Sequence, residues 1–305
     1  MSSAMPHPRY APHRAFISPA GRRGLWVVVF MLLVFELAFI ATPEFLAAAL
    51  PAPLAEAFWM GESRWAGLAQ LASFGLAGLV FVGALRAVQR RGVWSLLGPR
   101  RLFWPMMLKA AAAGVLVLAI QFAAPPYTPR EDFAEIRPLL PWLALVPAVL
   151  LVSLVQVGTE EIVYRGFLQQ ELAVRGAPVW LWMGLPSLLF GLAHFGAGTG
   201  MADAAAYVIW AACLGLACAD LTARTGSLGP AIGLHLANNA GSLLVFGEAG
   251  APLSGFALFL FPPWEPLPEQ LALPMLWSVT GIFDLALQLG GILVLWLAAR
   301  VAIRA

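Results

Sequence analysis

Eight stretches of the 305-residue chain are apolar over a length that can cross a lipid bilayer, which takes about 20 residues of α-helix. Hydrophobic residues make up 61% of the chain and charged residues 11%, whereas soluble domains average about 45–50% and about 25%. This composition excludes a soluble enzyme, a disordered chain and a nucleic-acid binder. We therefore expect an all-α polytopic membrane helix bundle. Its eight transmembrane helices should lie near residues 25–42, 66–88, 102–124, 139–158, 178–196, 204–222, 228–246 and 275–299.

The basic residues predict the orientation of these spans. With the N-terminus in the cytoplasm, 15 of the 18 basic residues fall on the cytoplasmic side, and only Arg64, Arg130 and Arg137 fall in outer loops. Cytoplasmic loops of membrane proteins carry such an excess of arginine and lysine. We expect both termini to be cytoplasmic, in an integral multi-pass protein of a bacterial cytoplasmic (inner) membrane.

The start of the first span divides the chain into a short tail and a membrane domain. Residues 1–23 contain four prolines and read as a flexible cytoplasmic tail, so residues 24–305 should form a single membrane domain. The first apolar run contains Glu36 and is longer than a typical signal-peptide core, so we expect an uncleaved helix. Cys213 and Cys218 would point to different sides of one helix, which makes a disulfide between them implausible.

Ionisable residues inside the apolar runs are functional candidates, because a charge in the hydrocarbon is costly. Glu160, Glu161 and Arg165 directly follow the fourth run. Glu161 and Arg165 are four residues apart, so on a helix they share a face and can form an ion pair. Glu160 has no such partner and is free to point into a cavity. A charge cluster at the helix end, without chemistry, is the alternative reading.

Two histidines lie within later apolar runs. His194 follows Phe190 by four residues, and His235 precedes Asn239 by four, while Asn238 is expected to turn away from His235. Either histidine can serve merely as a hydrogen-bonding residue between helices. With a turn at residues 176–178, however, Glu160 and His194 lie about 24 and 27 Å along antiparallel helices, which would place them nearly level.

A buried glutamate, two histidines and an asparagine can hydrolyse an amide. Glu160 can accept a proton from water that His194 orients, and His235 with Asn239 can stabilise an oxyanion. Alternatively, Glu160, His194 and His235 can hold a zinc ion that acidifies water. We favour the metal-free route slightly, because Asn239 lies on the same helix face as His235 and can be its partner. In addition, no further histidine or cysteine ligand is available. The sequence lacks the motifs of serine hydrolases, zincins and nucleotide hydrolases.

At these residues the chain resembles the CPBP family, which comprises CAAX proteases and bacteriocin-processing enzymes and is also called the ABI family. The family pattern is Glu-Glu-x-x-x-Arg, then Phe-x-x-x-His, then His-x-x-x-Asn. All positions match, in order and on three predicted helices. The matching residues are Glu160, Glu161, Arg165, Phe190, His194, His235 and Asn239. The resemblance covers about residues 139–246, the catalytic core of the family, and no motif supports the first three spans or the last.

The resemblance implies an intramembrane endopeptidase that cleaves near the C-terminus of membrane-anchored or lipid-modified substrates in the bilayer. It implies that Glu160 is the water-activating base with His194 as its partner, and that His235 and Asn239 form the oxyanion site. Glu161 and Arg165 would support them. The family is often called metalloprotease, but a metal-free mechanism has also been proposed for it. The main alternative is a non-catalytic membrane regulator or immunity-type protein that keeps the polar core. A transporter is disfavoured, because the sequence shows no internal repeat.

Overall fold

The computed structural model describes residues 8–21, 23–125, 127–197, 200–263 and 268–305. Within these ranges six helices are long and apolar enough to cross a membrane. They are α2 (Leu25–Ala48), α4 (Arg64–Gln89), α6 (Arg100–Ala123), the continuous helix Leu139–Val174, α10 (Met201–Thr225) and α13 (Val279–Ile303). The continuous helix comprises α7 (Leu139–Glu161), the π-helical segment η3 (Ile162–Gln169) and α8 (Gln170–Val174). The chain is thus an all-α polytopic bundle.

Two of the eight expected spans are shorter than predicted. The fifth is α9 (Val179–Ala193), of 15 residues, and the seventh is α11 (Gly229–Leu244), of 16 residues. Helix α9 stops because the backbone leaves the helical conformation at His194. Helix α11 stops because the chain then enters strand β2 (Phe246–Glu248). The prediction of eight full-length spans is therefore replaced by six long helices and two short ones within the described ranges.

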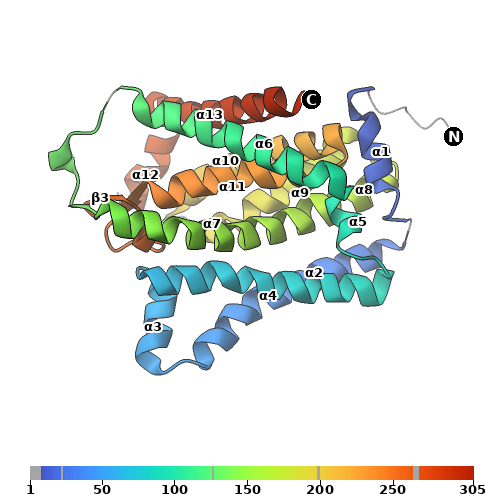
Figure 1. Cartoon of the computed structure of the whole chain (residues 1–305), viewed down its shortest axis with the longest axis horizontal. Coiled ribbons are helices and arrows are strands. Elements are labelled where there is room, and N and C mark those ends of the chain that lie inside the picture. Colours follow the sequence, from blue (N-terminus) through green and yellow to red (C-terminus); the bar gives the residue numbers. More distant parts are fainter. Residues whose placement is uncertain (1–7, 22, 126, 198–199, 264–267) are drawn as a thin grey trace.

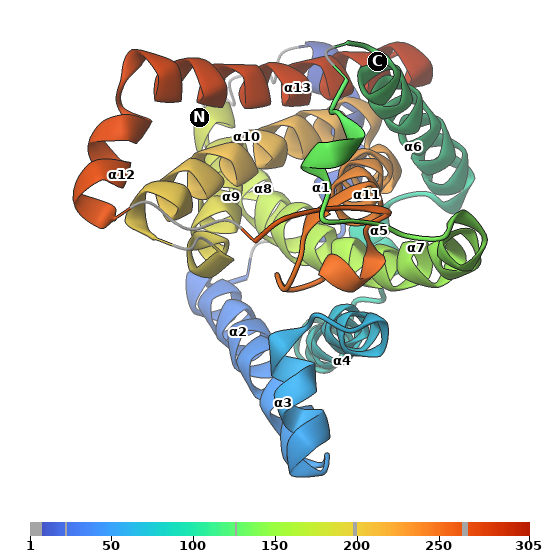
Figure 2. The same ribbon diagram turned by 90° about the vertical axis from the view of Figure 1, so that its left-hand side faces the viewer.

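Helix α11 lies at the centre of the bundle. It packs against α6, α7, α10 and α13, while α2 and α4 form a separate layer that contacts the rest through α7, η3 and the 3-10 turn Ser254–Phe256 (Figures 1 and 2). Gly229 and Gly233 make the close packing possible, because a Cβ atom at either would collide with the carbonyl oxygen of Phe103 or Met107 on α6. Small residues four apart allow this approach in membrane helices. The glycines thereby bring the helix that carries His235 into the interior.

Hydrogen bonds show which segments share an end of the bundle. At one end, the Tyr10 hydroxyl donates to Asp220 at 2.8 Å, and the indole of Trp296 donates to the same carboxylate at 3.0 Å. At the other end, Arg137 donates to the carbonyl oxygen of Ser254 at 2.9 Å. This grouping agrees with the alternation expected from the charge distribution. Which end faces the cytoplasm remains a prediction, and Arg22 and Glu265, which contributed to it, lie outside the described residues.

The segment before the first span is packed rather than loose over its described part. Helix α1 (Ala11–Ile17) follows a short 3-10 turn (Pro8–Tyr10), and Tyr10, His13 and Phe16 are buried. The His13 ring lies 4.5 Å from that of Trp182 on α9. The flexible tail expected over residues 1–23 is therefore too long, because its aromatic residues pack against apolar side chains of the bundle. Residues 1–7 lie outside the described part of the chain.

Burial of His13 predicts a pH-dependent stability. Desolvation lowers the pKa of His13 from 6.5 to about 4. As pH falls below 6.5, the unfolded chain takes up a proton that the folded chain excludes until about pH 4, so stability is lost across this window, by about 3 kcal/mol in all. We expect His13→Phe, which keeps an aromatic ring against Trp182, to lose less stability than the wild type between pH 7.5 and 4.5 in detergent melting experiments. Equal losses would contradict this assignment.

Several short elements complete the fold. Helices α3 (Ala52–Met60), α5 (Trp94–Leu97) and α12 (Glu269–Leu276) connect longer ones. Strands β1 (Glu135–Ile136) and β2 both pair with β3 (Phe259–Phe261), the first antiparallel and the second parallel. This small sheet, which the sequence did not predict, closes one end of the bundle. Cys213 and Cys218 are free thiols, as predicted.

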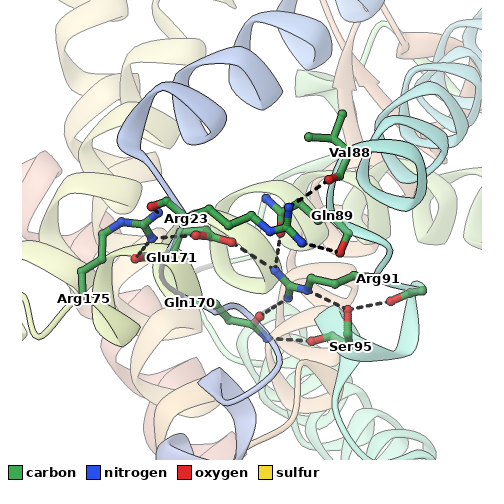
Figure 3. A network of polar contacts seen from close by, with 9 residues as sticks. Arg23, Val88, Gln89, Arg91, Ser95, Gln170, Glu171 and Arg175 are labelled. Carbon is green, nitrogen blue, oxygen red and sulfur yellow. Dashed lines mark hydrogen bonds and ion pairs between the residues drawn. The ribbon is translucent and has the colours of Figure 1, made fainter.

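A buried charge network surrounds α8, the C-terminal end of the continuous helix Leu139–Val174 (Figure 3). The Glu171 carboxylate on α8 is fully buried and accepts hydrogen bonds from Arg91 at 3.1 Å and from Arg175 at 2.6 Å. Arg91, which follows α4, also donates to the side-chain oxygen of Gln170 at 2.5 Å. The main-chain oxygen of Arg23, ahead of α2, accepts from Arg175 at 2.7 Å. The network joins α8 to the ends of α2 and α4.

We expect Glu171→Gln to destabilise the protein by about 3 kcal/mol, because it leaves the Arg91 guanidinium buried without its counter-charge. The matched control is Glu135→Gln, which removes an ion pair with Arg137 whose glutamate is 54% exposed. That change should cost about 1 kcal/mol or less. Both are measured by thermal unfolding in detergent. If the two variants melt alike, the network is not a stabilising one.

Candidate active site

The first motif lies where α7 passes into the π-helical segment η3. Glu160 and Glu161 are the last residues of α7, and Arg165 lies within η3. Single π-helical turns are rare and frequently occur at functional sites, where they redirect side chains. All three residues are buried, with Glu161 and Arg165 fully so. The helix continues past the apolar run to Val174, as the turn expected at residues 176–178 implies, and the charged cluster lies inside the bundle.

Glu161 connects two helices. Its Oε1 atom accepts a hydrogen bond from Arg165 at 2.9 Å, which confirms the predicted i,i+4 ion pair. The same oxygen lies 2.9 Å from Nδ1 of His235 on α11. A carboxylate only accepts hydrogen bonds, so Nδ1 carries the proton. Arg165 fits beside this pair because Gly215 on α10 has no side chain, and a Cβ there would lie 2.5 Å from the guanidinium.

Glu160 points away from this pair. Its Oε1 atom accepts a hydrogen bond from the Gln156 amide at 3.3 Å, and its Oε2 atom lies 3.7 Å from Nε2 of His235. Oε2 is buried and has no hydrogen-bond partner among the described residues. Buried polar atoms without a partner are rare, so this oxygen is a candidate for contact with water or substrate.

Phe190 and His194 lie at the end of α9, as their spacing predicts. The two rings are in contact, with centroids 4.6 Å apart. Phe190 also contacts His235 at 5.5 Å, and the Arg165 guanidinium lies 4.5 Å from the centre of its ring. Nδ1 of His194 lies 2.8 Å from the Phe190 carbonyl oxygen and therefore bears the proton. Its Nε2 atom is then an acceptor.

Helix α11 presents both asparagines to the site. Asn238 donates to the side-chain oxygen of Asn239 at 3.2 Å and lines the same cavity as His235 and Asn239. The expectation that Asn238 turns away is wrong, because residues three apart on a helix are neighbours as well as residues four apart. Asn239 donates to Gln156 at 3.5 Å, so Gln156 links it to Glu160. Gln156, a polar residue one turn before Glu160 in an apolar run, could have been singled out from the sequence.

Two cavities meet at these residues. The first, here named the histidine cavity, has a volume of about 470 Å³ and is lined by His194, His235, Asn238 and Asn239 among others. The second, the carboxylate cavity, has a volume of about 210 Å³ and is lined by Glu36, Glu160 and His194 among others. His194, Gln156 and Phe190 line both. The four expected polar residues therefore face two adjoining cavities instead of one shared cavity.

The same residues can be tested against a metal site. Within the described ranges no three histidine, cysteine or acidic side chains converge as metal ligands. Nε2 of His235 and Oε2 of Glu160 are 3.7 Å apart and form a possible pair, and Glu161 holds the histidine as a second carboxylate would. The third expected ligand, His194, does not join them in this arrangement. The described site therefore does not fit the three-ligand zinc site.

Comparisons with known proteins agree with the motif. Residues 141–241 match the family described as type II CAAX prenyl endopeptidase Rce1-like. No curated protein and no solved structure matches the chain. The matched segment begins in α7, ends in α11 and contains all seven motif residues. The family is one of proteases, and its members' name refers to prenylated proteins. Over this segment the chain is therefore similar to the Rce1-like family of type II CAAX endopeptidases.

Proposed function

We propose that this protein is a glutamate-dependent intramembrane endopeptidase that hydrolyses a peptide bond near the C-terminus of a membrane-anchored or lipid-modified substrate. The observation that carries the proposal is that Oε2 of Glu160 has no hydrogen-bond partner among the residues described, while Glu160 and His194 both line the carboxylate cavity. An unpaired carboxylate oxygen beside an imidazole acceptor is suited to hold a water molecule. Water held there would donate one hydrogen to Glu160 and the other to Nε2 of His194.

In the proposed reaction Glu160 takes a proton from this water, and the hydroxide oxygen forms a bond to the carbonyl carbon of the substrate. The negative charge develops on the carbonyl oxygen, which the Asn239 amide and His235 would contact from the histidine cavity. In this scheme His235 acts as an imidazolium: its Nδ1–H donates to Glu161, and its Nε2–H, which faces the reacting groups, donates to the oxyanion. Glu160 then delivers its proton to the amine nitrogen as the C–N bond breaks. No step in this scheme requires a metal ion.

Access to the site is part of the proposal. A peptide has to reach two cavities inside a helix bundle, and irregular backbone is tolerated at membrane depth only inside protein or along water. We infer that the substrate enters from the cytoplasmic side and from the lipid, through the gap that the carboxylate cavity marks between α2 and α9. This route is supported by Phe35 on α2 and Ala193 on α9, which both line the carboxylate cavity.

The function is tested by comparing C-terminal peptides from cells that contain the wild type or Glu160→Ala. We expect a set of membrane proteins to lose C-terminal residues only with the wild type. Identical C-termini in both strains would favour the alternative, a non-catalytic membrane regulator or immunity-type protein that keeps the polar core. Adding a chelator to the purified protein addresses the metal: the metal-free scheme predicts unchanged turnover.

A further inference from the structure

Glu36 is an ionisable residue that the proposed reaction does not use. It lies half-way along α2, among apolar residues, at a depth where a charge is costly. Such residues face the protein interior or a water-filled cavity and mark substrate or ion pathways. Glu36 is exposed in the bundle and lines the carboxylate cavity. It therefore lies where that cavity opens beside α2.

The rest of the carboxylate cavity is suited to a positive charge. Glu160 supplies a second carboxyl group. The remaining wall is largely aromatic, with rings from Phe35, Phe39, Phe74, Tyr164 and Phe190. Aromatic faces attract cations, arginine and lysine above all. Phe190 and Tyr164 already show this property on the Arg165 guanidinium, which lies 4.5 and 5.8 Å from their ring centres.

In the part of the chain that the structure describes, neither lysine nor arginine lines the carboxylate cavity. Its volume of about 210 Å³ suits a single extended side chain rather than a folded segment. Because Glu160 and His194 are in the same wall, a side chain bound there belongs to a residue next to the scissile bond.

We propose that the carboxylate cavity is a subsite for a basic side chain, lysine or arginine, of the peptide substrate, with Glu36 as its specificity-determining carboxylate. This inference rests on the proposed endopeptidase function, since it names the substrate class for that site. The ammonium or guanidinium group lies between Glu36 and the rings of Phe39 and Phe74, whose centroids are 5.1 Å apart.

The test uses lipid-anchored decapeptides in detergent micelles, in which each position in turn carries lysine or its uncharged analogue norleucine. At one position we expect the wild type to show a kcat/KM at least about tenfold higher for lysine, the size of effect that a desolvated cation–π and charge contact supports. Glu36→Gln should lower this ratio below about threefold. Glu44→Gln, on the same helix but outside the cavity, should keep it. Equal rates for both peptides at every position, or a ratio that survives Glu36→Gln, would overturn the subsite.

A binding measurement separates this inference from the proposed function. Fluorescence anisotropy of the same peptides is measured on Asn239→Ala, because Asn239 lines the histidine cavity and not the carboxylate cavity. Lysine-dependent binding without any cleavage by the wild type would support the subsite and overturn the endopeptidase proposal. Cleavage without a lysine preference in either assay would support the endopeptidase proposal and overturn the subsite. Glu36→Lys, which reverses the charge at the same position, should shift the preference from lysine to glutamate peptides, and an unchanged preference would again overturn the subsite.

Discussion

Glu160→Gln is expected to lower turnover of an identified substrate by about 10³-fold while the protein still inserts and folds. A positioned general base contributes about 10²–10⁴-fold to such reactions. The glutamine side chain keeps the size of Glu160 and its contact with Gln156, but it cannot take a proton from water. Turnover is measured in detergent or liposomes, and folding by thermal unfolding of the same preparation. The ion pair between Glu161 and Arg165 is untouched, so the melting temperature should change little.

Two companion variants define the outcome. His194→Ala removes the acceptor expected to orient the water. Its turnover should fall by a factor comparable to that of Glu160→Gln. Glu44→Gln, which lies outside both cavities, should turn over substrate like the wild type. Residual turnover by Glu160→Gln within tenfold of the wild type would rule out Glu160 as the general base. The zinc alternative would then regain weight, provided that His235→Ala is inactive and turnover is lost on chelation.

The sequence predicted local relations at the site well, because helical spacing determines them. The contacts of Glu161 with Arg165 and of Phe190 with His194 follow directly from a separation of four residues. Relations between helices depend on rotation about each helix axis, which an apolar sequence leaves open. The hydrogen bond between Glu161 and His235 could therefore not be foreseen.

The fold was predictable to the extent that hydrophobicity alone determines it. Six of the eight apolar runs form long helices, and the turn at Gly176 lies where it was expected. Helix α11 is shorter because protein surrounds it, and a buried helix does not need bilayer length. The packed N-terminal helix α1 was missed, because a few aromatic residues among prolines carry no periodic pattern. The division of the polar site into two cavities depends on side chains such as Leu71 and Phe74, from a span without motifs.

Arg165→Ala should produce the largest loss of stability in this chain, about 3–5 kcal/mol, because it leaves the Glu161 carboxylate buried beside His235 without its cation. The guanidinium is fully buried and also covers the ring of Phe190, so packing is lost as well. Activity should fall with stability, since Glu161 orients His235. Thermal unfolding in detergent and turnover are measured side by side.

The double variant Glu161→Gln with Arg165→Met separates the two effects of that change. It removes both charges and restores volume, so it should recover part of the lost stability, as replacement of buried ion pairs by apolar groups often does. It should not recover activity, because a glutamine side chain no longer fixes the charge and proton position of His235. A non-additive stability of the two changes measures the coupling of the pair. If Arg165→Ala instead melts like the wild type but is inactive, Arg165 contacts substrate and the ion pair is not what holds η3 against α11.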